Sequence, residues 1–116
     1  MLRIRREHKD AFHADAVAEL AERLAEHLRR FFPELCAPLD AGALDARIRD
    51  GMRRAEARGM INERDLAMFV DVALTRGEGF ESEPWASAIL EDDSLETPTD
   101  RAEALFEAAF AEEPSP

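Results

Sequence analysis

The apolar residues between Lys9 and Phe32 recur every three or four positions, which is the spacing of one face of an α-helix. This face consists of Phe12, Ala16, Leu20, Leu24, Leu28 and either Phe31 or Phe32. Pro33 ends the pattern, because the residue before a proline is disfavoured in helical backbone. The sequence therefore predicts a long first helix, and the only candidate for extended structure is Leu2–Arg5.

The middle of the chain predicts a helical hairpin. After a proline-containing connector, a second helix runs from about Ala41 to Arg58, with Leu44, Ile48, Met52 and Ala55 on one face. Gly59 suits the end of this helix, and Asn62 suits the N-cap of a third helix that ends near Arg76. Because few residues separate the two helices, we expect them to be antiparallel.

The third helix is apolar over a wide arc, so we expect it near the centre of the fold. A short helix then starts at Ser82 and Pro84, and a last helix runs from about Pro98 to Ala111 with Thr97 as its cap. The predicted fold class is all-α, a compact bundle of about four to five helices with a long N-terminal helix and a central hairpin. We expect a single domain over residues 1–111 and a disordered tail over 112–116.

The net charge of −11 is distributed unevenly. Residues 1–77 contain 14 acidic and 14 basic side chains, whereas residues 78–116 contain 12 acidic side chains and only Arg101 as a base. Such a field repels nucleic acid and anionic membranes and favours a basic protein surface. The alternative is an acidic face that serves only solubility.

The residues that carry catalytic or metal chemistry do not form a known pattern. His8, His13 and His27 have no Cys or His at metal-binding spacing, so we expect all three on the solvated surface. Cys36 is the only cysteine, which fits a reducing cytosol, and its position between two prolines favours a buried or half-buried structural thiol. We predict a protein that is not an enzyme, with no catalytic residue, cofactor site or metal site. The N-terminus has no secretory signal, and there is no run of about 18 apolar residues, so we expect a cytoplasmic location.

Five arginines crowd the second predicted helix: Arg47, Arg49, Arg53, Arg54 and Arg58. They could clamp phosphates or an acidic partner. The simpler interpretation is a charged face balanced by Asp45, Asp50 and Glu56, or one that faces the acidic last third of the chain.

The segment TRGEGFESEPW, Thr75–Trp85, is rich in glycine and acidic residues. It lacks the Lys and Ser/Thr that follow the glycines of a phosphate loop, and the alternating Asp or Asn of a calcium loop. We therefore interpret it as a packed corner between helices, with a glycine stop, Phe80 as an aromatic plug and Ser82 as a cap.

Three segments together resemble a family of small bacterial helical proteins encoded beside type VI secretion spike proteins, adaptor-chaperones and toxin effectors. They are FHADAVAELAERLAEHLRRFFPELC, IRDGMRRAEARGMINERDLAMFVDVALTRGEGFESEPWASAILED and TPTDRAEALFEAA. The resemblance implies a cytosolic helper in a toxin or effector cluster, such as an adaptor or chaperone-like partner, and it supplies no catalytic residues.

Two functions follow as hypotheses. The first is a non-enzymatic interaction module that binds a toxin, an effector, or a spike or adaptor component through Phe80, Trp85, Glu91, Asp92 and Asp93. The second is an immunity protein whose acidic surface mimics a nucleic-acid substrate and neutralises a toxin. A homodimer stays open, because a small helical domain can cover surplus apolar surface with a second copy.

Overall fold

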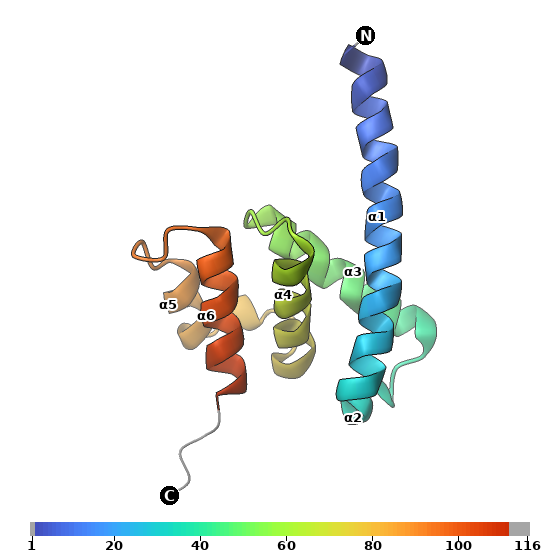
Figure 1. The fold of residues 1–116 in the computed structure, drawn as a ribbon. Helices are drawn as coiled ribbons and strands as arrows, with labels where there is room; N and C mark the ends of the chain where they lie inside the picture. Colours follow the sequence, from blue (N-terminus) through green and yellow to red (C-terminus); the bar gives the residue numbers. More distant parts are fainter. Residues whose placement is uncertain (1, 112–116) are drawn as a thin grey trace, which may run out of the picture. The chain divides into compact units, whose positions relative to one another are not determined.

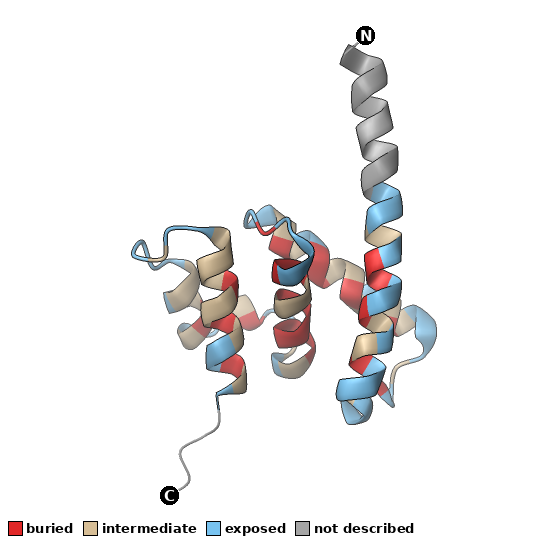
Figure 2. Ribbon diagram, in the orientation of Figure 1, coloured by how far each residue is buried: buried red, intermediate tan, exposed pale blue. Residues whose placement is uncertain are grey.

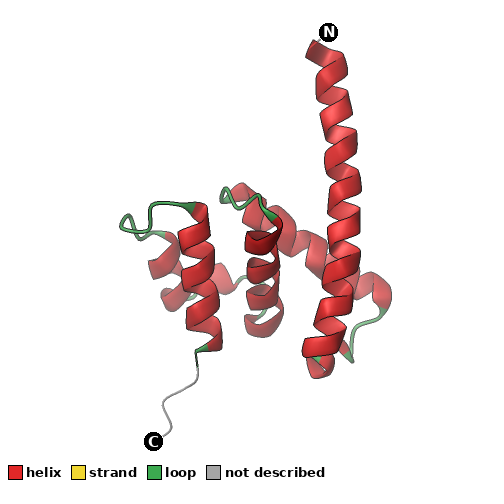
Figure 3. Cartoon of the chain, viewed as in Figure 1, coloured by secondary structure: helices red, strands yellow, loops and turns green. Residues whose placement is uncertain are grey.

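The computed structural model describes the backbone of residues 2–111 and the side chains of residues 14–111, and every regular element within it is helical (Figure 1, Figure 3). The elements are α1 (Leu2–Phe31), α2 (Pro33–Cys36), α3 (Ala41–Ala57), α4 (Glu63–Arg76), the 3₁₀ helix η1 (Phe80–Ser82), α5 (Pro84–Leu90) and α6 (Pro98–Phe110). The predicted all-α class is confirmed. The predicted disordered tail, 112–116, lies outside the described residues.

Two predicted features of the first part of the chain were wrong. Leu2–Arg5 is helical and not extended, because α1 begins at Leu2 in a segment of good helix formers without glycine or proline. The connector after Pro33 contains the short helix α2, which the sequence reading missed. Proline is favoured in the first turn of a helix, so the same Pro33 that ends α1 also starts α2.

The chain divides into two compact units, Met1–Arg49 and Asp50–Pro116, and the division falls inside α3. In the first unit α1 contacts α2, and the backbone N–H of Phe32 donates to the Leu28 carbonyl at 2.7 Å. The predicted apolar face of α1 is buried at Leu20, Leu24 and Leu28, but Phe31 is 60% exposed. Cys36 is buried, as predicted.

The second unit is built round α4. Each residue from Phe69 to Leu74 is buried, so the helix is covered on nearly all sides, as its wide apolar arc predicts (Figure 2). α4 packs mainly against α6, and α5 packs against both η1 and α6.

The junction between α3 and α4 explains how the hairpin turns. Gly59 has a φ of 86°, its N–H donates to the Glu56 carbonyl at 2.9 Å, and the N–H of Met60 donates to the Ala55 carbonyl at 3.0 Å. This bond pair is the Schellman motif, in which a left-handed glycine satisfies the last carbonyls of a helix. Asn62 then caps α4 by accepting from the Asp65 N–H at 2.8 Å. Both predicted helix ends are therefore confirmed.

A buried carboxylate connects the starts of α4 and α6. Asp65 is 1% exposed, and its Oδ2 accepts from the Thr99 hydroxyl at 2.7 Å and from the Asn62 amide at 3.0 Å. Thr97 and Asp100 form a reciprocal capping box at the beginning of α6, which confirms Thr97 as its cap. The two helix starts are thus fixed to each other by hydrogen bonds as well as by apolar packing.

Gly51 sets how closely α3 approaches α4. A Cβ at this position would lie 3.2 Å from Val70 Cγ2 and 3.9 Å from Ala73 Cβ. We expect Gly51→Leu to lower the free energy of unfolding by about 1–3 kcal/mol, because added methylene groups overpack a filled interface. Urea denaturation followed by circular dichroism measures the change.

Gly42→Leu is the matched control for this substitution, since Gly42 is exposed and also lies in α3. The nearest atom to its Cβ would be Asp40 Oδ1 at an ordinary 3.5 Å. Equal loss of stability in the two variants would show that the packing on Val70 is not the cause.

Candidate protein-interaction surface

The segment Thr75–Trp85 folds as a corner, as predicted. Gly77 ends α4 with a φ of 100° and donates to the Ala73 carbonyl at 2.9 Å. Gly79, with a φ of 80°, leads into η1. Both angles lie in the region that side-chain-bearing residues rarely adopt, so the two glycines are needed for the turn.

The predicted cap at Ser82 was wrong. Ser82 is the last residue of η1, and Glu83 occupies the N-cap position of α5 without a side-chain hydrogen bond to the helix backbone. The 3₁₀ turn delays the start of α5, because the Glu83 N–H is already bonded to the Phe80 carbonyl at 2.9 Å.

Phe80 lies in the core and not on the surface. It is 1% exposed, and its ring centroid is 5.1 Å from that of Phe69 and 6.0 Å from that of Trp85. The plug interpretation therefore fits Phe80, whereas a direct partner contact does not fit this buried position. Its ring stacks on that of Trp85.

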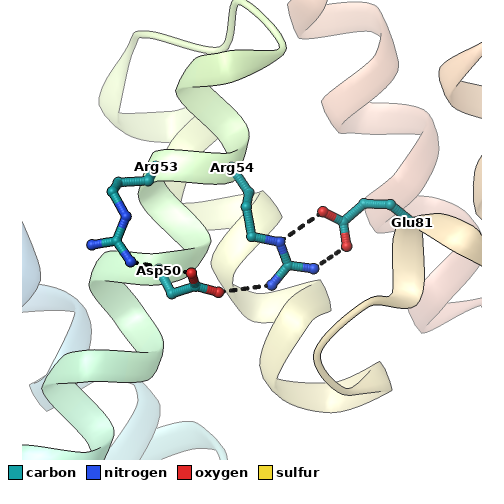
Figure 4. A network of polar contacts seen from close by, with 4 residues as sticks. All are labelled: Asp50, Arg53, Arg54 and Glu81. Atoms are coloured by element: carbon teal, nitrogen blue, oxygen red, sulfur yellow. Dashed lines mark hydrogen bonds and ion pairs between the residues drawn. The ribbon is translucent and has the colours of Figure 1, made fainter.

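Two arginines of the second predicted helix, Arg53 and Arg54, form hydrogen bonds with carboxylates of the same chain (Figure 4). Arg54 Nε donates to Glu81 Oε2 at 2.8 Å, and its Nη2 pairs with Oε1 of the same carboxylate. Its Nη1 donates to Asp50 Oδ2 at 2.9 Å, and Asp50 Oδ1 accepts from Arg53 at 3.2 Å. The hydrogen bond to Glu81 is the main reason why the pKa of Arg54 is raised.

Arg54 is therefore occupied by two carboxylates, one on its own helix and one on η1. This agrees with the interpretation that nearby carboxylates balance the arginines of this helix. The bond from Arg49 Nε to Asp45 Oδ2 at 2.9 Å is a further example. Because Glu81 lies in the acidic last third of the chain, part of that acidity neutralises this helix.

Trp85 is half-buried and is the aromatic member of the predicted contact set that reaches the surface. The Arg76 guanidinium lies 5.5 Å from its ring centroid, and Arg76 Nη2 donates to the Ala109 carbonyl at 3.0 Å. The indole N–H donates to Glu83 Oε1 at 3.1 Å. These contacts fix the indole between the ends of α4 and α6 and the start of α5.

Glu91, Asp92, Asp93 and Glu96 are all exposed in the connection between α5 and α6, which we name the acidic loop (residues 91–96). Asp92 Oδ1 accepts from the Ser94 N–H at 2.9 Å and from the Ser94 hydroxyl at 2.6 Å. Both bonds lower the pKa of Asp92, and the bond from the hydroxyl contributes most. The carboxylate is therefore charged at neutral pH. Arg101 is the one base in this third of the chain, and it donates to the Asp92 backbone carbonyl at 3.3 Å.

The structure brings together only part of the predicted set. Phe80 and Trp85 stack, but Trp85 lies in the first turn of α5 and Glu91 follows its last residue. At 1.5 Å per residue, about 9 Å of helix separates them. The predicted acids therefore form a surface separate from the two aromatic residues, and the structure adds Glu96 to it. The sequence signal for Glu96 is that the run of acidic residues continues up to Thr97.

The described residues bring no three His, Cys, Asp or Glu side chains together in a metal-binding arrangement. His27 is half-buried, with its ring 5.1 Å from that of Phe31, while His8 and His13 lie outside the described side chains. No helix between residues 2 and 111 has the length and apolar character needed to cross a bilayer.

Comparison of the whole chain with protein-family models, with curated proteins and with solved structures gives no match in any of the three.

Proposed function

We propose that the protein is a non-enzymatic interaction module and that its acidic loop binds a basic surface of a protein partner. The observation that supports this proposal is the exposure of four carboxylates within six residues, with a single arginine in the surrounding third of the chain. A dense negative field of this kind raises the association rate of a basic partner and orients it.

The acidic loop is anchored at both ends, which favours recognition by a fixed surface. The Ser87 hydroxyl donates to Glu91 Oε2 at 2.5 Å at the end of α5, and the capping box of Thr97 and Asp100 fixes the start of α6. Anchoring reduces the conformational entropy that the loop loses when a partner binds.

The class of partner comes from the resemblance to proteins encoded beside type VI secretion components. On that basis we propose a cytosolic adaptor or chaperone-like factor whose partner is a toxin, an effector, or a spike or adaptor component. Its acidic surface would hold a basic region of that partner before secretion.

The test of this proposal is charge reversal in the acidic loop. We expect Asp93→Lys with Glu96→Lys to slow association by about 10- to 1,000-fold, since electrostatic steering accounts for rate factors of that size. Glu91 and Asp92 are left unchanged because they shape the loop through Ser87 and Ser94. Copurification from the native host identifies the partner, and stopped-flow kinetics at low and high salt measures the rate.

The matched control reverses two exposed acids of α1, Asp15 and Glu19, which changes the net charge equally. Binding that is insensitive to salt, or equally sensitive to both sets of reversals, would rule out the acidic loop as the contact. If copurification recovers no secretion or toxin component, the proposed class of partner is wrong, but the proposed binding by the acidic loop is not affected.

The same acidic loop supports a second candidate, an immunity protein that blocks a toxin acting on nucleic acid. Clustered carboxylates can occupy a basic site that normally binds phosphates. Co-expression with a neighbouring toxin separates the two candidates, because an immunity protein restores growth and an adaptor does not. Continued killing in the presence of the protein would eliminate this candidate.

A further inference from the structure

The junction of α1 and α2 exposes apolar surface. Among the described residues the exposed large hydrophobic side chains are Phe31 at 60%, Leu35 at 38% and Ile61 at 77%, and the first two lie on either side of this junction. The His27 ring lies 5.1 Å from Phe31 and 6.2 Å from Phe32. Isolated exposed apolar residues are ordinary, but Phe31 is exposed beside two half-buried rings, and aromatic residues are enriched at binding surfaces.

Two exposed arginines at the end of α1 lie next to this apolar surface. Arg29 and Arg30 are exposed in the last turn of α1, and the Arg30 guanidinium lies 5.4 Å from the centroid of the Phe31 ring. Neither forms an ion pair with a carboxylate in the described part of the chain, unlike Arg49, Arg53, Arg54 and Arg64. Cations at a helix C-terminus also complement the helix dipole, but that role does not require an exposed phenylalanine.

A small hollow lies beside these residues. Its volume is about 220 Å³, and Arg29, Pro33, Cys36 and Ala37 line it. Pockets for small molecules usually measure roughly 300–1,000 Å³, so this hollow is better suited to one side chain. The Cys36 N–H donates to the Phe32 carbonyl at 3.2 Å and the Ala37 N–H to Pro33 at 2.9 Å, so ordered backbone supports the surface.

We propose that Arg29, Arg30, Phe31 and Leu35, named here the α1-end patch, bind an acidic peptide segment in which carboxylates flank an apolar residue. The guanidinium groups pair with the carboxylates, and the apolar residue packs on the exposed ring of Phe31, while the hollow beside Arg29 takes a neighbouring side chain of the segment. A short protein segment is favoured over nucleic acid or an anionic membrane, because it carries few charges and is repelled less by the net charge of −11, and because it supplies an apolar side chain to pack on Phe31. This surface shares no residue with the acidic loop and needs a partner of opposite charge, so either proposal can fail alone.

The test uses the full chain and a peptide array with two matched series. One series places Asp and Glu around a varied apolar residue, and the other replaces every acid with Lys. We expect binding to the acidic series only. The double variant Arg29→Glu, Arg30→Glu should lose at least about tenfold in affinity for that series and gain binding to the Lys series. A role limited to helix stability would not reverse the preference.

Phe31→Ala tests the apolar half of the proposal and should lower affinity for the acidic series about tenfold while leaving the acidic preference in place. Arg58→Glu and Ile61→Ala are the controls, since both positions are exposed and lie in the second unit. They should bind as the unaltered chain does, and circular dichroism confirms that all variants are folded.

Three results would overturn the proposal. The first is equal binding of the acidic and Lys series, and the second is an effect of the controls as large as that of the patch variants. The third is occupation of the patch by something else. Binding to phosphatidylserine vesicles, or a dimer in sedimentation that Phe31→Ala dissociates, would assign the patch to a membrane or to a second copy.

Discussion

Phe80→Ala is expected to lower the free energy of unfolding by about 3–5 kcal/mol, the range for truncating a buried phenylalanine. Phe80 is 1% exposed and packs between Phe69 and Trp85, so the truncation removes both ring contacts and leaves a cavity. Urea denaturation measures the loss, and the fluorescence of the single tryptophan reports the change at Trp85.

Phe31→Ala is the matched control for Phe80→Ala, because Phe31 is 60% exposed and its truncation opens no cavity. We expect a change within about 0.5 kcal/mol at this surface position. A loss at Phe80 no larger than that at Phe31 would contradict the assignment of Phe80 to the core.

The second large effect is expected at the ion pair between Arg54 and Glu81. Their side chains are 24% and 13% exposed, and they make two hydrogen bonds to each other. Glu81→Ala should lower the free energy of unfolding by about 1.5–3 kcal/mol, the range for hydrogen bonds to charged groups. A double-mutant cycle with Arg54→Ala isolates the interaction energy of the pair.

The pair Arg64 and Glu103 provides the comparison for this cycle. It joins α4 to α6 at 2.7 Å, but its side chains are 64% and 42% exposed. Exposed ion pairs contribute about 0–1 kcal/mol, because water screens them and two long side chains must be ordered. Equal interaction energies in the two cycles would show that burial does not strengthen the pair between Arg54 and Glu81.

The sequence predicts the helix ends well where local chemistry determines them. Gly59, Asn62 and Thr97 satisfy backbone groups within a few residues of themselves, so their roles follow from their immediate neighbours. The wide apolar arc of α4 also predicts its burial, because the arc can be read from the segment itself.

Two further features that sequence reasoning missed depend on residues far apart in the chain. Asp65 reads as a favourable first-turn acid, but it is buried and accepts a hydrogen bond from Thr99, which lies 34 positions later. Arg54 reads as one of several surface arginines, and its partner Glu81 is 27 positions away. No local pattern specifies either distance.

The candidate site shows the same limit. The sequence places both Phe80 and Trp85 in the contact set, and the structure separates them, because Phe80 is buried against Phe69 and Trp85 is half-buried. The charge run at Glu91–Asp93 is visible in the sequence, and the structure adds its exposure and the bonds to Ser94. The helical periodicity leaves Phe31 and Phe32 as alternatives for the end of the first apolar face, and only the structure shows that Phe31 is exposed and Phe32 half-buried.

The packing of α4 against α6 has a consequence during protein synthesis. Ribosomes make α4 before α6, so the nascent chain presents the apolar side of α4 without its cover until residues 98–110 have been added. Transiently exposed apolar surface of this kind promotes aggregation and engages chaperones. The second unit therefore acquires its core only after the ribosome has delivered α6, and translational pauses before Pro98 would lengthen that vulnerable interval.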